Sequence, residues 1–177
     1  MTKVIIRPLL ITSCCIGGLL AGGNVYRYII EVPAWRHLDI TDWSAYSKNA
    51  DLGNGLFLFP IEAFGNALPL IIASAICLKN RNLKPIASSL HVSTLFAIAG
   101  LALTFFAAPI MLHLPKIDGN IPLLQQAFNR FHFWGSLRGI TQVLSFLFCV
   151  LVVSNMYKLN IPGTEFKNFA KTVSYEI

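Results

Sequence analysis

The stretch FHFWGSLRGITQVLSFLF, from Phe131 to Phe148, determines how the whole chain is interpreted. It is apolar enough to open a membrane-spanning helix, yet it contains His132, Arg138 and Gln142. An ionisable side chain inside a bilayer costs at least ~2.5–3.5 kcal/mol on insertion scales and marks a functional site by default. The stretch therefore predicts a membrane helix with a polar site built into it.

The rest of the chain has the composition of a membrane protein. Of its 177 residues, 55% are hydrophobic and only 12% are charged, and the mean hydropathy is +0.61. Four apolar blocks are long enough to cross ~30 Å of hydrocarbon. They cover approximately residues 4–30, 53–78, 85–112 and 133–157. We expect one all-α domain over residues 1–177, an integral membrane four-helix bundle.

The basic residues predict the orientation of this bundle. Lysine and arginine flank the first block, fill the second link KNRNLKP and recur in the tail. The positive-inside rule therefore places both termini and the second link in the cytoplasm, and links 31–52 and 113–132 outside. The net charge of +6 is explained by these flanks and by anionic lipid, so we expect no nucleic-acid partner. A multi-pass protein of a bacterial inner membrane fits this pattern.

Polar residues recur on one face of three predicted spans. They are Asn24, Arg27 and Glu31 in the first, Glu62 and Asn66 in the second, and Arg138 and Gln142 in the fourth. Counted at about 1.5 Å per residue from the helix ends, all lie in the outer half of the bilayer. We expect them to form an outward-open pocket between helices, with Arg138 paired to Glu62 near its floor and Arg27 paired to Glu31.

The candidate residues fall into two groups. Candidate catalytic residues are Glu62, Arg138 and His132, and candidate substrate-binding residues are Trp134, Asn66, Gln142, Asn24 and Arg27. Purely structural interpretations stay open beside these: a buried ion pair can fix helix register, and amides can bridge helices. Arginine near a helix end can snorkel to the interface, and tryptophan is common there as an anchor.

A metal site is a further alternative. His37, His113, His132 and Glu62 could supply two histidines and one carboxylate from different elements. Their spacing does not demand a metal, because no H-E-x-x-H motif is present. We therefore expect no cofactor and no metal ligand.

Three motifs carry a resemblance to a known family. They are AGG in the first span, VPAW after it, and FNRFHFWGSLRGITQVL at the start of the last. With four spans, the chain resembles the anthrone oxygenase-like family of small membrane proteins, and the matching positions are Asn129, Trp134 and Arg138. The resemblance implies oxidation of phenolic anthrones to quinones by dioxygen without a cofactor.

The resemblance also implies roles for the polar residues. Glu62 or His132 would take a proton from the anthrone. Arg138 would stabilise the enolate oxygen as a fixed cation in an apolar pocket. Trp134 and Phe133 would flank the flat ring.

Two other classes of function remain. The protein could bind or transport a lipid, a quinone or another small molecule whose head group Arg138 holds. It could also be an accessory subunit whose polar face docks a membrane partner. Membrane lipid is an expected partner in each case, and a homo-oligomer stays open.

Overall fold

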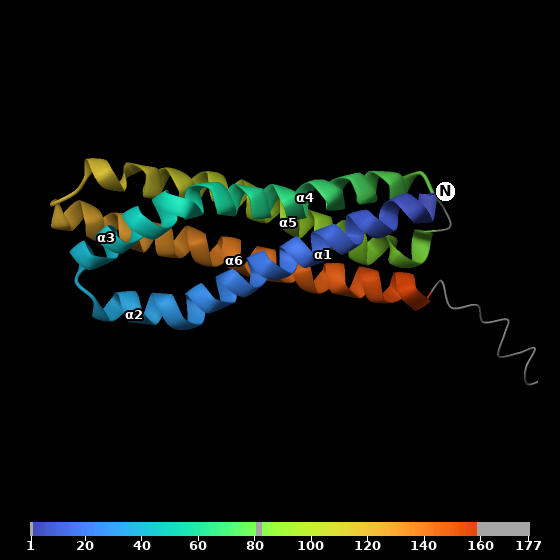
Figure 1. The fold of residues 1–177 in the computed structure, drawn as a ribbon, viewed down its shortest axis with the longest axis horizontal. Coiled ribbons are helices and arrows are strands. Elements are labelled where there is room, and N and C mark those ends of the chain that lie inside the picture. The colour runs from blue at the N-terminus through green and yellow to red at the C-terminus, as the bar shows by residue number, and fades with distance from the viewer. Residues whose placement is uncertain (1, 81–82, 159–177) are drawn as a thin grey trace, which may run out of the picture.

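The computed structural model describes residues 2–80 and 83–158, and every regular element in these ranges is a helix. The elements join into four long rods (Figure 1). The rods are α1 (Thr2–Tyr26), η1 (Arg27–Glu31) and α2 (Val32–His37); α3 (Ile40–Asn49), η2 (Ala50–Asn54) and α4 (Gly55–Leu78); α5 (Lys84–His113) and η4 (Leu114–Lys116); and α6 (Ile121–Lys158).

The rods run alternately up and down and pack in a ring. α1 contacts α4 and α6, and α5 contacts α4 and α6. We call the end with the chain start and the α4–α5 link the N-terminal end, and the opposite end the α2/α3 end (Figure 1). Each of the four rods is long and apolar enough to cross a membrane, which confirms the predicted all-helical class and the number of candidate spans.

The helices extend well beyond the apolar blocks that predicted them. α6 begins at Ile121, and the link 31–52 is helical except at residues 38–39. α6 has 38 residues, which at about 1.5 Å each exceeds the ~30 Å of a hydrocarbon core. In its first turns Leu124, Ala127 and Phe128 are buried while their neighbours are exposed. Such amphipathic turns do not stand out in a search for continuous apolar runs.

The turn before α6 explains where that helix begins. Gly119 has a φ of 79°, a left-handed conformation that favours glycine. Asn120 then accepts a hydrogen bond from the backbone N–H of Leu123 through Oδ1, at 3.2 Å. This side chain caps the first turn of α6 and fixes its start.

Two separate apolar cores hold the bundle together. The core at the N-terminal end includes Ile6, Leu10, Leu70, Ile86, Leu90, Cys149 and Val152. The core at the α2/α3 end includes Val32, Trp35, Trp43, Met111, Leu114, Leu124, Phe128 and Phe131. The predicted polar residues lie between these two cores, in what we call the polar layer: Asn24, Arg27, Glu62, Arg138 and Gln142.

Both π-helical turns of the chain's described part lie at this polar layer. η1 begins with Arg27, and η2 contains Asp51 and a kink at Gly53, where ψ is −119°. A π turn has one residue more than an α turn, and such turns are frequent at functional sites. Each π turn contributes one residue to the ion pair described next.

Candidate functional site

Arg27 is the centre of a buried charge network. Its Nε donates to Glu31 Oε2 at 3.0 Å, which confirms the predicted pair, and its Nη2 donates to Asp51 Oδ1. The Tyr46 hydroxyl donates to the other oxygen of Glu31 at 2.9 Å. Two carboxylates therefore neutralise Arg27, so this residue acts first as a structural cation that joins η1 to η2.

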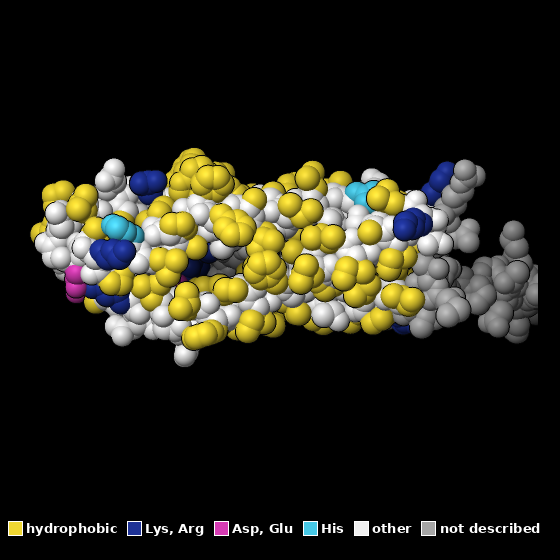
Figure 2. Space-filling model, turned by 90° about the horizontal axis from the view of Figure 1, so that it is seen from above, with side chains coloured by type: hydrophobic (Ala, Val, Ile, Leu, Met, Phe, Trp, Pro, Cys, Tyr) yellow, Lys and Arg dark blue, Asp and Glu magenta, His cyan; other side chains and the backbone are white. Residues whose placement is uncertain are grey.

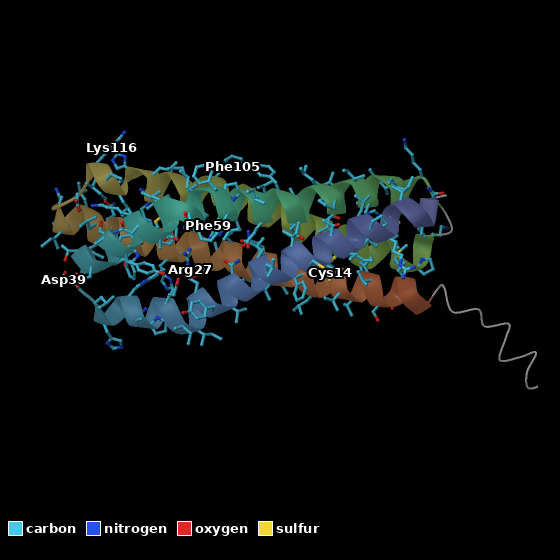
Figure 3. The ribbon with its side chains drawn as sticks, in the orientation of Figure 1. Cys14, Arg27, Asp39, Phe59, Phe105 and Lys116 are labelled. Atoms are coloured by element: carbon cyan, nitrogen blue, oxygen red, sulfur yellow. The ribbon has the colours of Figure 1, made fainter. Side chains whose placement is uncertain are left out.

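Aromatic rings complete the surroundings of this guanidinium. Its central carbon lies 5.6 Å from the ring centroid of Trp35 and 5.3 Å from that of Phe59. Figure 3 shows Arg27 and Phe59 on rods that face each other across the polar layer. Cation–π contacts of this length favour a fixed orientation of the charge.

Asp51 is the functional residue that the sequence did not single out. It belongs to the acidic link 31–52, yet its side chain is only 5% exposed in the pair with Arg27. Its Oδ2 is buried and has no hydrogen-bond partner among the described residues. One feature of the sequence could have identified it. Asp51 directly precedes the second apolar block, which places it at about the same membrane depth as Arg27 near the end of the first block.

Arg138 does not form the predicted pair with Glu62. Among the described residues its side chain has no hydrogen bond or ion pair, and its Nε is buried without an acceptor. The physical reason is that Arg138 and Glu62 line one cavity of about 200 Å³, so open space separates them. Asp51, a buried acid nearby, is already paired with Arg27. Arg138 is thus an unneutralised cation in a largely apolar setting.

Three cavities meet at the arginines. Arg27 and Arg138 line all of them. The largest, about 370 Å³, lies between the α1–α2 rod and α6; the second, about 200 Å³, reaches Glu62; the third, about 110 Å³, lies between α4 and α5. Figure 2 shows a hollow in the face seen from above, with a basic side chain at its floor.

The largest of these three cavities, which we call the lateral cavity, opens on the side of the bundle. Its wall includes Tyr28, Ile29 and Ile140, which are more than half exposed and so form its mouth. Its opposite wall includes Trp35 and Phe131, which are buried. A volume of this size, mostly apolar and with few polar groups, is typical of small-molecule sites.

His132 lies at the rim of the lateral cavity, with its ring stacked against Tyr28 and Phe128 at 6.2 Å in each case. Its Nε2 lies 3.0 Å from Nη2 of Arg36. Because arginine can only donate, Nε2 must be the unprotonated nitrogen that accepts this bond. His132 therefore links α6 to α2 through Arg36. The Nε2 lone pair accepts this hydrogen bond, so it cannot act as a base while the bond persists.

The predicted amides have separate roles. Asn24 donates to Gln142 Oε1 at 2.7 Å and joins α1 to α6, and both residues line the cavity that contains Glu62. Asn66 instead lies deeper toward the N-terminal end, where it accepts a hydrogen bond from Ser13 at 2.8 Å. It fixes α1 against α4 and does not line the three cavities at the arginines.

Trp134 lies on the other side of α6 from the lateral cavity. Its ring stacks on Phe106 of α5 at 4.9 Å, and it lines none of the three cavities. Asn129 and Phe133 are exposed. Of the three positions that carry the family resemblance, only Arg138 is at the site.

The four residues of the metal alternative are dispersed. His37 is exposed at the end of α2, and His113 lines a separate groove between α5 and α6. His132 and Glu62 line different cavities. In the described ranges, no group of three or more histidine, cysteine or acidic side chains is placed to hold a metal ion.

The chain matches no family model, no curated protein and no solved structure. The geometry of Arg138, Glu62 and the lateral cavity is therefore the basis for assigning a function.

Proposed function

We propose that the chain is a multi-pass membrane protein, of a bacterial inner membrane, with its α2/α3 end outside and both termini in the cytoplasm. Only 22% of the most apolar window in each of the α5 and α6 rods is buried, so most residues of these windows are at least partly exposed. Figure 2 shows hydrophobic side chains along the middle of the molecule and charges toward its two ends. Exposed Lys79 and Lys84 at the N-terminal end favour that end as cytoplasmic.

Within that membrane the protein binds an apolar aromatic small molecule whose oxygen is held by Arg138. The observation that carries this proposal is the buried Nε of Arg138, which has no acceptor although the residue lines three cavities. A guanidinium in apolar surroundings is costly unless it is paired. A phenolate, enolate or carbonyl oxygen supplies the missing acceptor, and hydrogen bonds to a charged donor are about twice as strong as neutral ones.

The reaction that fits is oxygenation without a cofactor. Glu62 takes a proton from the CH₂ that lies opposite the carbonyl in the central ring of an anthrone, and the resulting enolate oxygen is stabilised by Arg138. The enolate carbon then adds dioxygen to give a hydroperoxide. Loss of water leaves a second carbonyl, so one oxygen atom enters the product and the other leaves as water. Glu62 suits the role of base because it lines a cavity with Arg138 and has no ion-pair partner among the described residues.

Oxygen uptake tests this proposal. Purified protein in lipid nanodiscs is given anthrone, and uptake by autoxidation is subtracted. We expect Arg138→Leu and Glu62→Gln each to lower the protein-dependent rate by about 100-fold or more. Arg130→Leu is the matched control, because Arg130 is an exposed arginine of α6 outside the three cavities, and it should retain full uptake.

Binding without turnover is the second candidate, favoured by the fact that Arg138 lacks an acceptor whether or not a base acts beside it. In that case anthrone binds, no oxygen is consumed, and Glu62→Gln binds as well as the wild type. Equal binding by wild type and Arg138→Leu would contradict both candidates.

A further inference from the structure

The lateral cavity has two chemically different arms that meet at Arg138. Toward the α2/α3 end its wall contains all of its ring side chains, Tyr28, Trp35, Phe128, Phe131 and His132, together with Ile29 and Val32. Toward the N-terminal end its wall is aliphatic, with Val25, Ile140, Val143 and Leu144. A uniform apolar ligand would not need this division, whereas a ligand with a ring and a chain would match it.

The cavity is also elongated. Its wall on α6 runs from Phe128 to Leu144, which are 16 positions apart, or about 24 Å along the helix. Its wall on the α1–α2 rod runs from Asn24 to Trp35, which are 11 positions apart, or about 16 Å. The cavity is therefore longer than a single ring, so a ring in the aromatic arm leaves the aliphatic arm for a second part of the ligand.

We propose that the occupant is a phenol or quinone whose ring head group carries one long alkyl or isoprenoid chain. This inference rests on the proposed binding at Arg138 and specifies the ligand class. The ring lies among the aromatic side chains, where offset stacking is favourable, and its oxygen meets the guanidinium. The chain follows the aliphatic arm and leaves through the mouth beside Val25 and Ile140, which are 42% and 56% exposed.

Gly135 allows a sharp test because it lies in the wall of the cavity. A Cβ added at this glycine meets no atom within 4 Å, so leucine fits the backbone and its side chain occupies the slot. Gly22→Leu is the matched control, because a Cβ there is equally free and the residue lines none of the three cavities. Both changes favour helix formation, so neither should prevent folding.

Binding is measured by quenching of tryptophan fluorescence, with Trp35 in the aromatic arm as the expected reporter. The ligands are decylubiquinone, the same quinone without its chain, decanoic acid and anthrone. We expect decylubiquinone to bind at least about tenfold more tightly than the chain-less quinone, since burial of two methylenes already gives this factor. Gly135→Leu should weaken its binding at least about tenfold relative to Gly22→Leu. Each ligand partitions into the lipid equally with both variants, so partition does not change the ratio of their affinities.

The alternative outcomes separate the two proposals. If the chain-less quinone or anthrone binds as tightly as decylubiquinone and Arg138→Leu abolishes it, the single-chain inference fails and the proposed function stands. If decanoic acid matches decylubiquinone, recognition of the ring is wrong. If no ligand binds, or if Arg138→Leu leaves every affinity unchanged, both proposals fail.

Discussion

The two ends of the bundle hold their helices together in different ways. At the N-terminal end, Ser93 and Ser145 each donate to the other's backbone carbonyl, at 2.8 and 3.0 Å, and Ser13 bonds Asn66. From the polar layer to the α2/α3 end, the helices are joined by charges, π turns and stacked rings. The buried polar atoms that lack a partner among the described residues all lie in this second region: Trp43 Nε1, Ser44 Oγ, Ser47 Oγ, Asp51 Oδ2 and Arg138 Nε.

This difference separates an end whose contacts stabilise the bundle from an end at which we propose that a ligand binds. Neutral hydrogen bonds between membrane helices average about 0.6 kcal/mol and leave no charge to satisfy. Unpaired polar groups lower stability and are retained mainly where function requires them. Four changes test this division, from the largest expected effect to the smallest.

Loss of Asp51 should have the largest effect. Asp51→Ala leaves Arg27 buried with Glu31 as its one remaining carboxylate, and breaking a buried pair costs about 3 kcal/mol. The free energy of unfolding in mixed micelles measures the change. Asp42→Ala is the control, because Asp42 is exposed on the same rod, and a loss equal to that control would show that the pair is not stabilising.

A clash at the N-terminal end should cost about 2 kcal/mol, the middle of the range for overpacking. A Cβ added at Gly17 would lie 2.8 Å from Oδ1 of Asn66, which Ser13 holds in place. Gly17→Val should therefore lower the unfolding free energy, while Gly22→Val, with open space at its Cβ, should not. Ligand affinity should be unchanged in folded Gly17→Val; a selective loss of affinity would mean that the two ends are coupled.

Removal of the unpaired cation should stabilise the protein. Arg138→Met replaces a guanidinium that has no acceptor by an apolar side chain, and we expect a gain of about 1 kcal/mol together with loss of binding. Arg27→Met is the matched comparison and should have the opposite sign, because it strands two carboxylates. Destabilisation by both variants would indicate that Arg138 has a structural partner.

The surface ion pair at the α2/α3 end should matter least. Lys48 Nζ lies 2.5 Å from Asp118 Oδ2, but the Asp118 side chain is 61% exposed. Lys48→Ala should lower the unfolding free energy by about 0.5 kcal/mol in low salt. At about 1 M salt the difference should disappear, since the Debye length is then about 3 Å. A stability difference that persists in high salt would contradict the expectation that this ion pair is a screened surface contact.

The sequence predicts the local features of this protein better than the distant ones. The apolar blocks predict the four rods, and the i, i+4 spacing of Arg27 and Glu31 predicts their ion pair, because both depend on one helix alone. Arg138 was expected to meet Glu62 because their depths agree. Depth does not show that a cavity separates the two side chains, and no periodicity reveals the kinked turn that brings Asp51 to Arg27.

Rotation of a helix about its axis is the second feature that the sequence does not provide. Trp134 was expected beside Arg138, since the two are four positions apart, yet its ring packs on Phe106 of α5. A large side chain reaches sideways from its own position, so residues of one helical face can contact different neighbours. The sequence predicts that three helices contribute residues to the polar layer. It does not predict which cavity each residue lines, because that depends on such packing.

The π turn at η1 depends on a single extra residue in the chain. Deletion of the exposed Ile30 would shorten Arg27–Glu31 to an ordinary α turn and rotate α2 by about 100° relative to α1. Trp35 would then turn away from the lateral cavity while the helical content of the chain stayed the same. Unchanged circular dichroism with loss of quinone quenching would verify this. A single codon thus decides whether Trp35 joins the rings that α6 contributes to the wall of this cavity, Phe128, Phe131 and His132.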